Sequence, residues 1–171
     1  MDLYELKKLI ELNRESEGVE MFPGVVSIAV VVRKRKHTEH TCVLMLKDGV
    51  HEGDLQGYWV LPGGEYTEGG LCEARAAALL LRETGIEVQP SDLELKFVAS
   101  DPRRDPRWAS ICLVYRIDFR EDRKFLNNLH RLGVPIEYRW IPLPEILVTG
   151  TDPIALDHRD IVRRACTGFA R

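Results

Sequence analysis

Several features are scarce or absent in this chain of 171 residues. No apolar run is long enough to cross a membrane, and none near the start has the character of a signal peptide. A basic surplus is also missing, because 24 Lys and Arg face 27 Asp and Glu and the net charge is -3. The sequence therefore predicts a cytoplasmic protein that contacts neither a membrane nor nucleic acid.

Cysteine is sparse, and its spacing argues against two kinds of cross-link. The four cysteines lie far apart and form neither a metal-type pair nor a disulfide framework. Three of them stand among apolar neighbours and are predicted to be small core residues: Cys42, Cys72 and Cys112. Internal repeats and low-complexity segments are absent too. With 44% apolar and 30% charged residues, the chain is typical of one globular domain.

Most of the chain has the pattern of β-strands. Residues 25–33 form a continuous β-branched run, which predicts a strand buried on both faces. Tyr58 and Trp59 are adjacent in another strand, so only one of the two rings is expected to point inward. The residues predicted as strands are 25–33, 41–47, 58–61, 93–100, 109–119 and 136–141.

Helical spacing is confined to a few segments. Residues 2–13 predict an amphipathic helix within an N-terminal extension, residues 1–24, which packs on the main domain or forms a dimer contact. The main domain is predicted to span residues 25–171. Residues 120–133 predict a short polar helix or loop, and residues 158–169 a final helix with Asp157 as its N-cap.

The most distinctive stretch is residues 59–86. It passes through a Pro62-Gly63-Gly64 turn into a helix predicted at about residues 71–84. One side of this helix carries Cys72, Ala76, Leu79, Leu80 and Glu83, and the other carries Ala74, Ala77, Ala78 and Leu81. Since a helix with two apolar sides is normally buried, we expect it to lie between its own sheet and another segment or a second subunit, as in a homodimer.

This stretch closely resembles the Nudix box of hydrolases that cleave nucleoside diphosphates linked to another group. Gly64, Glu83, Gly85 and Ile86 match the motif, whereas Gly70, Ala78, Leu79 and Arg82 replace three Glu and one Arg: Gly70, Leu79 and Arg82 stand for Glu, and Ala78 for Arg. The resemblance implies an α/β (α+β) fold with a mixed β-sheet sandwiched between helices. It leaves Glu83 as the candidate catalytic and metal-binding residue, and it makes weak binding of Mg²⁺ the expectation.

A second stretch concentrates charge between two prolines, in the sequence Asp-Pro-Arg-Arg-Asp-Pro-Arg at residues 101–107. Proline restricts both itself and the preceding residue, so this loop is stiff. Its arginines suit bidentate recognition of a phosphate. An internally salt-bridged turn explains the same residues equally well, and the sequence leaves both interpretations open.

This loop resembles that of ADP-ribose pyrophosphatase-like Nudix proteins and of Nudix-related regulators of NAD metabolism. Residues 155–161 resemble the Asp-His motif of the same group, in which His158 has either a structural or a nucleotide-binding role. The regulators' winged-helix module has no counterpart here, so no DNA binding is expected. The ligand-binding residues that the resemblance implies are Trp59, Gly63, Gly64, Arg103, Asp105, Arg107 and His158.

Three functions fit these observations. The first is a Nudix-fold protein that binds ADP-ribose or a related nucleoside diphosphate derivative, with hydrolysis lost or weak. The second is an active Mg²⁺-dependent pyrophosphohydrolase whose metal ligands are relocated to other carboxylates. The third is a structural subunit that pairs with an active Nudix protein. The relocated carboxylates would come from Glu65, Glu68, Glu73, Glu121, Glu137 and Glu145.

Overall fold

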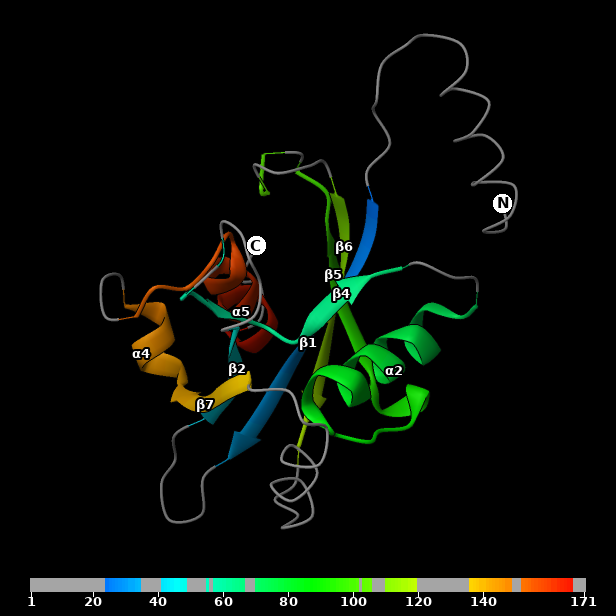
Figure 1. The fold of residues 1–171 in the computed structure, drawn as a ribbon, viewed down its shortest axis with the longest axis horizontal. Helices are drawn as coiled ribbons and strands as arrows, with labels where there is room; N and C mark the ends of the chain where they lie inside the picture. Colours follow the sequence, from blue (N-terminus) through cyan, green and yellow to red (C-terminus); the bar gives the residue numbers. More distant parts are fainter. Residues whose placement is uncertain are drawn as a thin grey trace, which may run out of the picture.

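The computed structural model describes residues 24–34, 41–48, 55, 57–66, 70–101, 103–105, 110–119, 136–148 and 152–167. The helix predicted at residues 2–13 and the segment 120–133 lie outside these residues. Figure 1 shows the elements in chain order: β1 (Gly24–Lys34), β2 (Thr41–Asp48), β3 (Trp59–Val60), β4 (Gly63–Glu65), α2 (Cys72–Thr84), the 3-10 turn η1 (Pro90–Asp92), β5 (Glu94–Ala99), β6 (Ser110–Asp118), β7 (Ile136–Pro142), α4 (Leu143–Leu147) and α5 (His158–Thr167).

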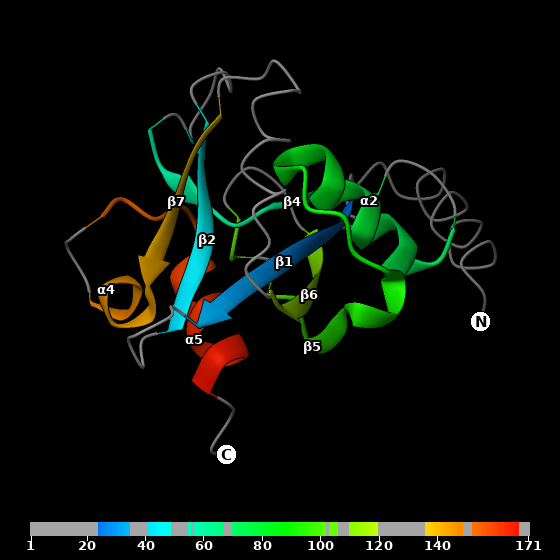
Figure 2. The same cartoon turned by 90° about the horizontal axis from the view of Figure 1, so that it is seen from below.

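Strand β1 is the centre of a mixed sheet. On one edge it pairs in parallel with β6 along its length, from Gly24 opposite Ser110 to Val32 opposite Asp118. Its other edge is divided, with β4 antiparallel to its first half and β2 antiparallel to its last residues. The main order is β3-β2-β1-β6-β5, and β7 adds to β2 (Figure 2). Strand β1 thus pairs both with β4, which contains the glycine turn, and with β6, which follows the Asp-Pro-Arg loop.

Helices cover both faces of this sheet (Figure 1). Ile28, Val30 and Val32 point to the face that α4 and α5 cover, where they join one core cluster. Ala29 and Val31 point to the opposite face and pack with the apolar residues of α2. The predicted burial on both faces holds for Ile28 to Val32, while Val25, Val26 and Arg33 are half-buried. The predicted mixed sheet between helices is confirmed.

The remaining predicted strands agree with the structure except in the burial of β5. Trp59 is buried and Tyr58 is exposed, as their alternation requires. Leu95 is 48% exposed, so β5 lacks the regular alternation of a half-buried strand. The reason is that β5 is an edge strand whose register shifts between Leu95 and Phe97, so the period-two alternation is interrupted there.

Helix α2 follows the predicted segment closely. Gly85 ends it with a left-handed φ of 71°, and its N–H donates to the carbonyl of Leu81 at 2.8 Å. One assignment was wrong: Ala77 is buried, because it lies only about 60° round the helix from the buried Leu80. The outward side of this helix presents Leu71, Ala74, Ala78 and Leu81 to solvent.

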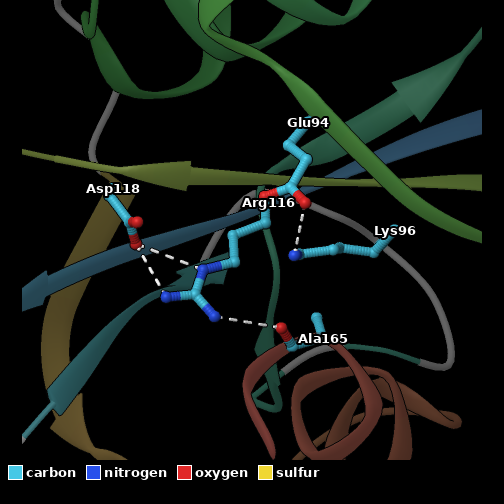
Figure 3. A network of polar contacts seen from close by, with 5 residues as sticks. All are labelled: Glu94, Lys96, Arg116, Asp118 and Ala165. Carbon is cyan, nitrogen blue, oxygen red and sulfur yellow. Dashed lines mark hydrogen bonds and ion pairs between the residues drawn. The ribbon is translucent and has the colours of Figure 1, made fainter. Parts of the chain in front are cut away.

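A network of polar contacts connects strand β6 to helix α5 (Figure 3). Arg116 of β6 donates from Nη1 to the carbonyl of Ala165 at 3.2 Å, near the end of α5 where helix carbonyls lack partners within the helix. Nε and Nη2 of Arg116 donate to Asp118, at 3.1 and 2.8 Å. The pair with Asp118 orients Arg116 within β6, and the bond to Ala165 connects β6 to α5, whose first residue is His158.

The structure also bears on the cysteines and on membranes. The four cysteines are free, and Cys42 and Cys112 are buried as predicted, while Cys72 is half-buried. Burial raises the pKa of the Cys112 thiol to about 12, so this group stays protonated and is a poor nucleophile.

Among the described residues, no helix has the length and apolar character needed to span a membrane.

Candidate functional site

The glycine turn joins the sheet to helix α2. The N–H of Ala29 donates to the carbonyl of Pro62 at 2.9 Å, and Gly63 and Gly64 then pair with Ile28 and Ser27 of β1. A Cβ atom at Gly64 would lie 3.2 Å from Cδ2 of Leu79 and 3.3 Å from Nη2 of Arg82. A side chain at position 64 would therefore make tight contacts and require Leu79 or Arg82 to shift, which is a physical reason for glycine in this turn.

Trp59 and His158 hold this turn from the side of the last helix. The N–H of Trp59 donates to Pro153 at 2.7 Å, and its carbonyl accepts from Ala155 at 3.0 Å. Trp59 is 4% exposed and belongs to the core, which favours a supporting role. Its predicted contact with a ligand stays a prediction, as do those of Gly63 and Gly64.

His158 connects the start of α5 directly to the strand before the turn. It is buried, and its Nδ1 accepts a hydrogen bond of 3.0 Å from the backbone N–H of Leu61. A backbone N–H can only donate, so Nδ1 is the unprotonated nitrogen of the ring. Of the two roles left open by the sequence, this geometry supports the structural one.

The Asp-Pro-Arg loop is tied to the same helix start by Arg104. Its guanidinium donates from Nε and Nη2 to the two carboxylate oxygens of Asp157, at 2.9 and 3.1 Å, and from Nη1 to Oγ of Ser110 at 2.8 Å. The Arg104 side chain is only 5% exposed. The Asp157 carboxylate, predicted as an N-cap, thus serves as the partner of Arg104.

The neighbouring Arg103 is arranged differently. Its side chain is 88% exposed and forms a bidentate pair with Asp101, at 3.0 and 2.9 Å. The Arg103 side-chain hydrogen bond is the main cause that lowers the pKa of Asp101 to about 2. Asp105 is buried, and Arg107 lies outside the described residues. Of the loop arginines that are described, Arg103 is the one exposed to an incoming anion.

Comparison with known proteins addresses the fold. No protein-family model and no curated protein matches the sequence. A MutT/nudix family protein from Enterococcus faecalis is 20% identical, with a TM-score of 0.69 over 96% of this chain and 68% of that chain. The NUDIX domain of Shewanella oneidensis NrtR, solved with ADP ribose, is 19% identical, with a TM-score of 0.65 over 96% of this chain and 97% of that chain. The chain has the Nudix fold.

Other proteins with this fold are solved with further molecules. A bifunctional NMN adenylyltransferase/ADP ribose pyrophosphatase from Francisella tularensis, complexed with AMP and a Mn ion, is 19% identical, with a TM-score of 0.58 over 95% of this chain and 47% of that chain. The NrtR structure with a 27mer DNA is 22% identical, with a TM-score of 0.63 over 82% of this chain and 59% of that chain. At these identities the likeness establishes the fold, and the absence of a nucleic-acid partner here stays a prediction.

The metal site of a Nudix box does not fit the residues of this chain. Positions 79, 82 and 83 would supply three carboxylates, but Leu79 and Arg82 fill the space beside Gly64. Glu83 remains, and its Oε1 accepts a hydrogen bond of 2.9 Å from Nε of Arg82 and forms an ion pair with Nη2 at 2.8 Å. No group of three His, Cys, Asp or Glu residues with metal-binding geometry occurs in the described part of the chain. Mg²⁺ prefers several oxygen ligands, so Glu83 alone makes a poor site for it.

The residues that build this site were only partly predictable. The sequence did not single out Arg104, Ser110 or Leu61, although all three hold the loop or turn in place. The one available signal was the pairing of a loop rich in arginine with an Asp next to His158. That signal does not say which arginine reaches the Asp, because adjacent residues in a turn have no fixed inward side.

Proposed function

We propose that this Nudix-fold protein binds ADP-ribose or a related nucleoside diphosphate derivative and hydrolyses it weakly or not at all. The observation that carries the proposal is the ion pair between Arg82 and Glu83, which occupies the one carboxylate left at the box. Loss of the metal ligands removes the means of activating water and of neutralising the diphosphate for cleavage. The contact of Arg104 with Asp157, just before α5, supports retention of a binding site, because it ties the Asp-Pro-Arg loop to the start of the last helix.

The phosphate contact that we propose is Arg103. Its guanidinium already forms a planar bidentate pair with the Asp101 carboxylate, and the same fork geometry suits a phosphate. Because the pair is exposed, exchanging the carboxylate for a phosphate requires little rearrangement. Arg107 is proposed as a second contact from the same loop, as the resemblance implies. Asp105 and His158 are buried beside the loop and are proposed to position it.

ADP-ribose is expected to stabilise the protein without being consumed. A ligand at about a hundred times its dissociation constant adds about 2.7 kcal/mol, which is roughly 5–10 °C in melting temperature for a chain of this size. Adenosine, which lacks the diphosphate, is expected to give no such shift. The measurements are differential scanning fluorimetry and product analysis after incubation with Mg²⁺. Rapid hydrolysis that Glu83→Gln abolishes would instead establish an active enzyme.

The outward side of α2 favours a second role for this surface, as a contact between two copies of the chain. Leu71 is 76% exposed and Leu81 is 44% exposed, with Ala74 and Ala78 between them. We propose a homodimer through this side, since burying such a stripe removes apolar surface from water.

Leu81→Glu is expected to convert the dimer to a monomer, because it places a charge within the apolar stripe of the proposed contact. The matched control is Leu95→Glu, which changes a leucine of similar exposure, 48%, on the edge strand β5. Sedimentation velocity would report the two masses. A wild-type protein that is already monomeric at high concentration would contradict the proposed contact.

A further inference from the structure

Arg82 stands where the Nudix box has a metal-binding carboxylate, and the structure gives its position. The guanidinium lies against the glycine turn, with Nη2 at 3.3 Å from the place of a Cβ on Gly64. Leu79, at a second of the former carboxylate positions, fills the neighbouring space with its methyl groups. A positive charge is thus held between the end of β4 and the last turn of α2.

Glu83 orients this charge. Its Oε1 accepts a hydrogen bond from Nε of Arg82 and forms an ion pair with Nη2, which orients one edge of the guanidinium plane. A guanidinium has five N–H donors, and this pair faces only the edge formed by Nε and Nη2. The Arg82 side chain is 67% exposed and the Glu83 side chain is 24% exposed. The carboxylate is therefore partly buried, while the guanidinium is accessible to a ligand from solvent.

We infer that the Arg82 guanidinium is a fixed cation that replaces the divalent ion in binding the ligand's diphosphate. This inference rests on the proposed function, because it concerns the same ligand. Arginine is always protonated at physiological pH, and it binds phosphate oxygens with a planar fork. Its charge is present without any metal, so the affinity for ADP-ribose is independent of Mg²⁺.

Competition at Glu83 supports the same conclusion. A divalent ion arriving at this carboxylate must displace Arg82, and the described residues offer it no group of three His, Cys, Asp or Glu ligands. Mg²⁺ gives up its water reluctantly and favours several oxygen ligands. The guanidinium therefore stays paired with Glu83, and the diphosphate binds to Arg82 without a metal ion between them.

Calorimetric titration of ADP-ribose into the full chain tests this inference, in EDTA and in Mg²⁺ at equal ionic strength. The wild type is expected to give the same dissociation constant in both buffers. Arg82→Gln is expected to weaken binding by about tenfold to a hundredfold, the range for a charge-assisted hydrogen bond. Arg75→Gln is the matched control, an identical change two turns earlier on the same helix, and it is expected to leave affinity unchanged.

The outcomes separate this inference from the proposed function. Binding in Mg²⁺ that EDTA abolishes overturns the fixed cation and leaves the proposed ligand intact. Equal affinity of the wild type and Arg82→Gln also overturns it. If ADP-ribose gives neither heat nor a melting shift in either buffer, the proposed function fails and this inference fails with it.

Discussion

Replacing Arg104 with methionine is expected to lower the melting temperature by about 6–12 °C, the equivalent of about 3 kcal/mol for a chain of this size. The Arg104 guanidinium is almost fully buried and donates to both oxygens of Asp157 and to Ser110. Removing it leaves a partly buried carboxylate without its partner, which costs more than the loss of an exposed ion pair. Thermal unfolding followed by circular dichroism would measure the change.

The matched control for this prediction is Arg103→Met. It makes the same substitution one residue earlier in the loop, at a side chain whose ion pair with Asp101 lies in solvent. Little change in melting temperature is expected, because exposed pairs contribute little to stability. Adding Asp157→Leu to Arg104→Met should recover part of the loss, since the unpaired carboxylate is then gone. Equal destabilisation by the two single variants would show that burial of Arg104 is not the deciding factor.

The double variant Leu79→Glu, Arg82→Glu is expected to bind Mn²⁺ or Mg²⁺ with a dissociation constant of about a millimolar or tighter, where the wild type shows no binding. The two substitutions place carboxylates beside Glu83 and remove the guanidinium that occupies it. Without metal the variant should be less stable than the wild type, because Leu79 is buried and Glu brings charge into its place. Calorimetry and metal-dependent melting would measure both effects.

The control for the metal experiment is Leu79→Gln, Arg82→Gln. Glutamine has nearly the same shape as glutamate and lacks its charge, so this variant should be destabilised without gaining metal affinity. If metal raises the melting temperature of the glutamate variant and not of the glutamine variant, the missing carboxylates are the reason that the wild-type box binds no metal ion. If neither variant binds metal, the cause lies elsewhere, for example at Gly70 or Ala78, the other two positions that depart from the motif.

Much of the fold was predictable because its strongest patterns reflect burial. The run at residues 25–33 is largely apolar because helices cover both sides of β1, and a mixed sheet between helices was predicted correctly. Short elements were missed: η1 and α4 have three and five residues, too few to show a helical period. The exposure of Leu95 could not be predicted, because a register shift in an edge strand leaves no mark in composition.

The candidate site was predictable in its segments but not in its contacts. The sequence identified the glycine turn, the Asp-Pro-Arg loop and the start of the last helix, and each of these contributes. It did not distinguish Arg103 from Arg104, although one is 88% and the other 5% exposed. That difference depends on the position of Asp157, which lies 53 positions from Arg104 in the sequence and contacts it in the fold. Contacts of this range follow from the assembled sheet and not from local pattern.

The hydrogen bond between Leu61 and His158 spans 97 positions, and this span has a consequence for the order of folding. Contacts between distant residues form late, because the entropy of closing the loop is lost before the contact stabilises anything. The turn at Gly63 and Gly64 can pair with β1 early, yet its support from α5 comes only when the sheet is complete. We therefore expect the proposed ligand site to be among the last parts of the molecule to form. If so, affinity for ADP-ribose will report whether the whole chain has reached its native state.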